Sequence, residues 1–437
     1  MDFLSQINHL FRRDISEQIQ NFINGEFVPP EDGKFADTFN PSTGEALCKY
    51  PLSTVKDVER AVDAAKSAFN LWSKVCKNER ANILNQVAKL LGKRSEAFIR
   101  AEIMDQGRAI HGVSKEDNDI AREVLNIKYF TAQAVATMES ATKSQGIPKG
   151  VVNVVYGKGD VLGRAMAAHP TVKALALAGS ERTASAILAV GQLLYTKKFT
   201  FHLGNCHPMI VFEDANLEEV LPVAIRGSFL RNEGQNVHSI NRIYVHASIL
   251  QTFTEKFIRV VQRLKIGSAH ETGIQVGPLI SKDHRQRIIG LIQGAVNDGA
   301  ELLWGGKIPK LDSKLGKGFF LEPTILGGFQ SSTINTINTL EVQGPVVRII
   351  PFRNANEAIE AANGTMYGLS ASVWCKDVKV AHKIADQLNV GSVWINSWLP
   401  NEPNMPHESW KQSGLGRTGG AYSIDFYTEL KTVSIKF

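Results

Sequence analysis

Residues 149–169, KGVVNVVYGKGDVLGRAMAAH, decide the fold class of this chain. A run of β-branched residues is followed by a glycine loop and then by an alanine-rich segment, which predicts strand, turn and helix in that order. Residues 172–191, VKALALAGSERTASAILAVG, repeat the order, and so do residues 241–264 and 347–364. Repeated strand–loop–helix units predict an α/β fold in which helices cover a parallel sheet.

The N-terminal third is predicted to be mostly helical. Apolar residues at helical spacing predict three helices, over residues 54–69, 78–107 and 114–137. Before them, Asn24-Gly25 between two short apolar runs predicts a β-hairpin over residues 21–28. The chain closes on FYTELKTVSIKF, residues 426–437, whose alternation of apolar and polar residues predicts a strand.

The composition indicates a folded protein of two or three domains in a reducing compartment. The 437 residues are 43% hydrophobic and 21% charged, which is enough for large cores. The net charge of +6 is not gathered into a Lys/Arg block, which argues against nucleic-acid binding. The four cysteines are far apart, so we expect neither a metal site nor a disulfide framework. Without a secretory signal or an apolar run long enough to span a membrane, we expect a cytoplasmic protein.

Two glycine-containing turns are candidate nucleotide sites. Gly157, Gly159 and Gly163 have the spacing Gly-x-Gly-x-x-x-Gly, which differs from the dinucleotide motif GxGxxG. These glycines serve either a nucleotide or simply a tight strand-to-helix turn, and the pattern leaves both open. In the second turn, AGSERTA, Gly179 and Ser180 are placed to offer backbone N–H groups to a phosphate.

Several phrases together resemble the aldehyde dehydrogenase superfamily. They include HLGNCHPMIVFEDANLEE, EGQNVHSINRIYV, LEVQGPVVRIIPF and QSGLGRTGG, in the family's order. FEDANLEE, GSVWINSWL and DFYTELKTV are most similar to the branch that oxidises 2-aminomuconic semialdehyde. The resemblance implies a truncated Rossmann-type cofactor domain at residues 1–203, an α/β catalytic-type domain at 204–405, and a return segment with a C-terminal bridging strand at 406–437.

The resemblance also implies that the catalytic groups of the family are replaced here. In relatives, a cysteine thiolate attacks the aldehyde, hydride passes to NAD(P)+, and a glutamate-activated water releases the acid. Val237 stands at the nucleophile position and cannot attack a carbonyl, and His202 stands at the position of the base, where we expect a neutral filler. We expect His238 to point away from the cleft. Cys206, at the position of a family lysine, and His207 cannot form a replacement pair, because adjacent residues of a strand face opposite sides.

A segment of the cofactor domain is implied to be missing between residues 143 and 150. Relatives have roughly fifty additional residues there, more than one βαβ unit. That stretch contains an asparagine that helps to hold the oxyanion, the contacts to the adenosine ribose, and half of the hairpin used for assembly.

Few cofactor-binding positions of the family remain. Gly179, Ser180 and Glu341 are the vestigial candidates, and Glu341 corresponds to the carboxylate that binds the nicotinamide ribose. Gln343 replaces the aromatic residue that packs beside this carboxylate in relatives. We therefore expect no bound cofactor, with NAD as the candidate if any binding is retained.

Three readings of function follow. The first is a catalytically inactive aldehyde dehydrogenase-like protein, a pseudoenzyme with a binding, regulatory or structural role whose partner is an unidentified protein or a second copy. The alternative is NAD-dependent oxidation of an aldehyde or semialdehyde to its acid, in a funnel lined by Asn396 and Trp398. The third is a shortened chain that does not fold stably.

Overall fold

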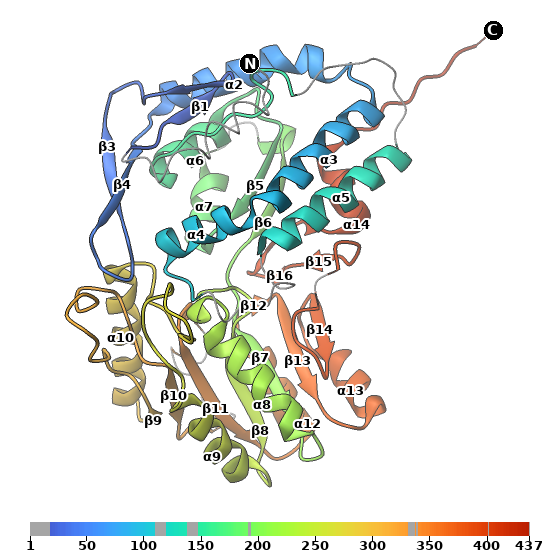
Figure 1. The fold of residues 1–437 in the computed structure, drawn as a ribbon. Coiled ribbons are helices and arrows are strands. Elements are labelled where there is room, and N and C mark those ends of the chain that lie inside the picture. Colours follow the sequence, from blue (N-terminus) through green and yellow to red (C-terminus); the bar gives the residue numbers. More distant parts are fainter. Residues whose placement is uncertain are drawn as a thin grey trace.

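A seven-stranded sheet forms the larger half of the molecule (Figure 1). A computed structural model describes residues 18–109, 119–137, 147–190, 194–330, 337, 340–400 and 402–436. The strand order is β14-β13-β7-β8-β11-β10-β9, and every pair is parallel except β10 with β9. The strands are β7 (His207–Val211), β8 (Ile240–His246), β9 (Glu301–Trp304), β10 (Thr324–Gly327), β11 (Val346–Phe352), β13 (Ser370–Trp374) and β14 (Ser392–Ile395).

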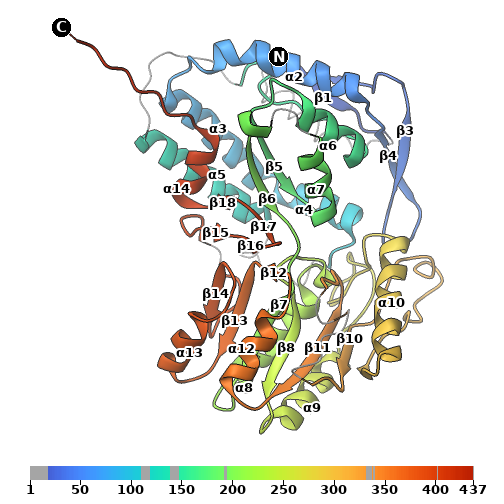
Figure 2. The same cartoon turned by 180° about the vertical axis from the view of Figure 1, so that it is seen from behind.

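Helices cover both faces of this sheet (Figures 1 and 2). They are α8 (Leu217–Ile225), α9 (Leu250–Val261), α10 (Lys282–Asn297), α12 (Ala355–Asn363) and α13 (Val378–Ala385). One apolar cluster contains Ile288, Ile359 and Ile384 of α10, α12 and α13, and a second contains Val220 and Phe257 of α8 and α9. Because both faces are covered, strands such as β7 are buried at every position.

A second sheet has three strands in the order β17-β6-β5. β5 (Ala174–Ala178) and β6 (Lys198–His202) are parallel, and β17 (Gly414–Leu415) pairs with β6 in the antiparallel direction. The helices α6 (Gly159–Ala168) and α7 (Glu181–Ala189) pack on it through a small apolar cluster. Within the described residues β5 pairs only with β6, so its other edge is open.

The hairpin predicted over residues 21–28 is confirmed. Its strands are β1 (Asn21–Ile23) and β2 (Glu26–Val28), and Asn24 and Gly25 between them have φ angles of 53° and 76°. Two successive residues with positive φ form the turn that suits the twist of a hairpin. A second antiparallel pair follows, consisting of β3 (Phe35–Phe39) and β4 (Ala46–Pro51).

Of the predicted N-terminal helices, the first is confirmed as α2 (Val55–Trp72). The third is confirmed over α5 (Asp119–Thr137), and residues 114–118 of that prediction lie outside the described residues. The helix predicted over residues 78–107 is instead two helices, α3 (Lys77–Lys93) and α4 (Ser95–Gln106). The break falls at Arg94, whose backbone leaves the helical region with φ −114° and ψ 13°. Residues 92–96, GKRSE, contain no apolar side chain, so the sequence carried a signal of this break that the prediction of one long helix did not use.

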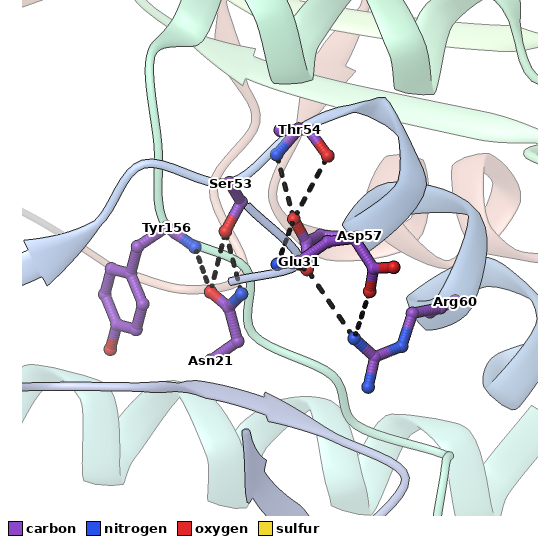
Figure 3. A network of polar contacts seen from close by, with 7 residues as sticks. All are labelled: Asn21, Glu31, Ser53, Thr54, Asp57, Arg60 and Tyr156. Carbon is purple, nitrogen blue, oxygen red and sulfur yellow. Dashed lines mark hydrogen bonds and ion pairs between the residues drawn. The ribbon is translucent and has the colours of Figure 1, made fainter. Parts of the chain in front are cut away.

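A buried polar network ties the start of α2 to the hairpin (Figure 3). The carboxylate of Asp57 is fully buried and accepts hydrogen bonds from the backbone N–H groups of Thr54 (2.9 Å) and Glu31 (3.0 Å). The side-chain oxygen of Asn21 accepts the N–H of Tyr156 at 3.0 Å. Together these bonds fix the first glycine turn, which follows Tyr156, against the N-terminal elements.

The β-branched strand predicted to precede the glycine loop within residues 149–169 is wrong. Only Val154 pairs there, through two backbone hydrogen bonds with Phe22 of 2.8 and 2.9 Å. Phe22 lies in β1, which already has β2 as its hairpin partner, and the segment joins no named sheet. β-branched residues favour a strand only where a neighbouring strand is available.

The strand predicted over residues 426–437 is also wrong for the chain by itself. Its first two residues belong to α14 (Gly420–Tyr427), and residues 428–436 form no strand with the described part of the chain. Lys198 Nζ donates to the carbonyl oxygen of Thr428, and beyond this point the tail leaves the body of the molecule (Figures 1 and 2). A strand requires the edge of another strand, and none lies beside the tail.

Candidate functional site

The candidate site lies where the chain passes from the small sheet to the large one (Figure 1). β6 ends at His202, and the carboxyl ends of parallel strands are where α/β sheets bind ligands. The next residue, Leu203, donates its N–H to the carbonyl of Ser413 at 2.8 Å, and Asn205 Nδ2 donates to Ser370 Oγ at 3.1 Å. The crossing segment is therefore held by the return segment and by β13.

The loop expected to hold the nucleophile is a tight turn before β8. Gly234 has φ 72°, and the carbonyl of Gly344 lies so close to it that a Cβ would not fit. Asn236 Oδ1 accepts the N–H of His238 at 2.8 Å, which places Val237 in the turn between them. Val237 is half-buried, and its side chain has no group that can react.

His238 lies close to His407 and His202. Its ring centroid is 6.0 Å from that of His407 and 5.8 Å from the ring of Trp394. Burial first, and then the nearby His407, lower the pKa of His238 to about 3. Burial and then His407 also lower the pKa of His202, so His202 is neutral at pH 7.

Cys206 and His207 have different neighbours, as adjacent residues of an extended chain should. Cys206 is 1% exposed, and its Sγ lies 3.5 Å from Asn241 Oδ1 and 3.7 Å from Arg348 Nη2. The ring of His207 is bound instead by the serines of β13, with Nδ1 3.0 Å from Ser370 Oγ. Because Cys206 is enclosed, a substrate cannot reach its sulfur.

Polar groups of the turn before α7 are hydrogen-bonded to other groups of the chain. Gly179 donates its N–H to the carbonyl of His202 at 3.1 Å, and Ser180 Oγ accepts the N–H of Thr183 at 3.3 Å as the helix N-cap. The expectation that Gly179 offers its N–H to a phosphate is therefore wrong. The sequence pattern could not reveal this, because the acceptor on His202 comes from the neighbouring strand.

Two carboxylates meet at Gly204, at the amino end of α7. Glu181 Oε1 accepts the N–H of Gly204 at 3.2 Å. A methyl group on Gly204 would lie 2.5 Å from Glu181 Oε1 and 2.9 Å from Glu341 Oε2. Burial raises the pKa of Glu341 to about 7. A hydrogen bond from the backbone of Asn205 opposes this shift, and the nearby Glu181 adds to it. Gln343 Nε2 donates to Glu341 Oε2 at 2.9 Å, whereas Glu341 Oε1 is buried without a hydrogen bond among the described residues.

Glu233 is a buried carboxylate that the motif reasoning missed. It is 1% exposed, and its Oε1 accepts the N–H groups of Gly277 (2.9 Å) and Ala109 (3.4 Å). Burial raises its pKa to about 7. The signal in the sequence was an acidic residue directly before Gly234-Gln235, although its partners are distant along the chain.

The two expected funnel residues have different surroundings. Trp398 lies at the site, because its Nε1 donates to the carbonyl of His238 at 3.0 Å. Asn396 instead bonds both the N–H (3.0 Å) and the carbonyl (2.8 Å) of Cys375. The amide of Asn396 is therefore occupied in holding the end of β13.

Metal binding and membrane spanning find no support in the part of the chain that the structure describes. No group of three or more His, Cys, Asp or Glu side chains there could hold a metal ion. No described helix is both long and apolar enough to cross a membrane.

Nearly the whole chain matches one family. The sequence profile of the aldehyde dehydrogenase family matches residues 27–142 and 124–433. The chain belongs to the aldehyde dehydrogenase family. This confirms the family and the α/β fold that the sequence indicated.

Two similar proteins are named as semialdehyde dehydrogenases. The chain is 33% identical over 486 residues to 2-aminomuconic semialdehyde dehydrogenase of Mus musculus, covering 96% of the chain and 98% of the relative. It is 30% identical to 2-hydroxymuconic semialdehyde dehydrogenase of Pseudomonas sp. (strain CF600), covering 96% of the chain and 100% of the relative.

Solved structures of aldehyde dehydrogenases have the same fold. The enzyme from Bacillus cereus superposes with a TM-score of 0.88 at 29% identity, over 96% of both chains. Betaine aldehyde dehydrogenase from Staphylococcus aureus, solved in complex with NAD+, superposes with a TM-score of 0.87 at 26% identity, over 97% of this chain and 94% of the other.

Proposed function

We propose that this chain is a catalytically inactive member of the aldehyde dehydrogenase family with a binding, regulatory or structural role. The loop before β8 carries the proposal, because its turn has Val237 where the family mechanism needs a thiolate. Ser239 follows, but its Oγ is buried and has no hydrogen-bond partner among the described residues. A hydroxyl without a neighbouring base is a poor nucleophile.

Other groups of the family mechanism are also without support in this chain. His202, at the position of the base, is neutral at pH 7, because burial and then the nearby His407 lower its pKa. Cys206 is buried, so it cannot replace the missing thiolate. Without a thiolate or an acyl intermediate, no step of the mechanism has its reacting group.

A shortened cofactor domain adds to this support. The aligned length of 486 exceeds the 437 residues of the chain, so the mouse relative has residues without a counterpart here. The family profile matches in two pieces that overlap at residues 124–142, next to the expected junction. Residues 143–146 of that junction lie outside the described residues.

An assay of NADH formation over a panel of semialdehydes tests the proposal. We expect no turnover from the natural chain, and none from Val237→Cys, because restoring sulfur leaves the base and the oxyanion donor missing. Loss of such groups costs orders of magnitude in rate. Turnover that Cys206→Ala abolishes and the matched buried-cysteine control Cys375→Ala retains would establish the alternative, an active aldehyde dehydrogenase.

A further inference from the structure

We propose that Glu181 occupies the amino end of α7 and thereby excludes nicotinamide dinucleotides. This role rests on the proposed function, because it supplies one physical reason for an inactive chain. It concerns a side chain of this protein and the position where the family's cofactor would lie. The residues present at the amino end of α7 and at Glu341 do not fit that cofactor.

The amino end of α7 already carries a carboxylate, that of Glu181. A helix N-terminus attracts negative charge because its first N–H groups are unpaired. Glu181 is the first residue of α7, and its carboxylate lies at this end of the helix, where it also accepts the N–H of Gly204 at 3.2 Å. A phosphate placed here would meet a fixed like charge.

Two backbone donors of the turn are also taken. The N–H of Gly179 is bonded to His202, and the N–H of Thr183 is bonded to Ser180 Oγ. A diphosphate that used these two donors would have to displace the carbonyl of His202 and Ser180 Oγ from them. Unpaired polar groups of this kind oppose binding.

Glu341, at the position of the carboxylate that binds the nicotinamide ribose in relatives, is also occupied. Glu341 Oε2 already accepts from Gln343, and it lies near the same point beside Gly204 as Glu181 Oε1. Tyr367 crowds this point too, with a ring carbon 2.7 Å from the place of a Gly204 Cβ. Two carboxylates and a phenol ring therefore fill the space between the amino end of α7 and Glu341.

Calorimetric titration of the full chain with nicotinamide mononucleotide and with NAD+ tests this role. The mononucleotide is the sharper probe, because it lacks the adenosine half whose contacts are expected in the missing segment. We compare the natural chain with Glu181→Gln, which removes only the charge, and with Glu181→Ala, which removes the side chain. The matched control is Glu218→Gln, an exposed glutamate in the first turn of α8.

We expect the natural chain and Glu218→Gln to bind neither probe at millimolar concentration. Both Glu181 variants should bind the mononucleotide at least about ten-fold more tightly, because a like charge has been removed. Variants that melt cooperatively yet still fail to bind would overturn the role of Glu181. Binding of NAD+ by the natural chain without NADH formation would also overturn it, while leaving the proposed inactivity intact.

Discussion

Buried titratable side chains couple the stability of this fold to pH in opposite directions. Burial raises the pKa of Glu233 from 4.5 to about 7, so its contribution to stability is fully present below pH 4.5 and is lost as the pH rises through 7. The contribution of Glu341 to stability depends on pH in the same direction and over the same pH range. Burial lowers the pKa of His238 from 6.5 to about 3, so its contribution is present above pH 6.5 and is lost as the pH falls toward 3.

Glu233→Gln isolates the carboxylate contribution. The amide keeps the acceptor for Gly277 but cannot ionise, so the variant should gain stability relative to the natural chain as the pH rises from 5 to 8. The expected change in relative free energy of unfolding is about 2 kcal/mol. Urea unfolding at the two pH values measures it. The exposed Glu255→Gln serves as the control, and an equal effect in both variants would contradict the assignment.

At the scale of elements, the predictions that held are those with local causes. The hairpin over residues 21–28 depends on two adjacent residues that accept positive φ, and α2 depends on its own apolar spacing. The strand predicted before the glycine loop and the strand predicted over residues 426–437 were both wrong, because pairing depends on where other strands lie. Apolar pattern alone cannot supply that position.

Asp57→Ala should destabilise the start of α2. The substitution removes the acceptor for the N–H groups of Thr54 and Glu31 and leaves both unpaired near the hairpin. The expected loss in free energy of unfolding is about 2 kcal/mol, measured by urea unfolding. Asp63→Ala, an exposed site on the same helix, should change stability little. Equal stability of the two variants would show that the network of Figure 3 does not hold this junction.

At the scale of the whole molecule, the tail is apolar and uncovered. Leu430 is 96% exposed, and Val433 and Ile435 are each 70% exposed. Exposed apolar segments without a sheet to join favour association with another chain. A second copy is therefore the partner that we propose for this surface.

Removal of residues 428–437 should leave the melting temperature nearly unchanged, because the described part of the tail is anchored only near its root. Lys198 contacts Thr428 and Glu429, and Thr428 also bonds the carbonyl groups of Ile424 and Asp425 at the end of α14. The truncation should also shift the chain toward monomer in sedimentation velocity over a range of concentrations. A full-length variant with Leu430→Ser, Val433→Ser and Ile435→Ser separates apolar contact from length. Association that survives both changes would place the interface elsewhere.

The sequence by itself determined the family, the α/β class and the identity of the residue at position 237, because these depend on which side chains occur and in what order. Only the tertiary structure decided that Glu181 meets Glu341 at Gly204, that His238 faces His407, and that Glu233 is buried against Ala109. Each of these contacts joins residues far apart in the chain. Their distances and pKa values arise from the packing of separate elements, which no local pattern encodes.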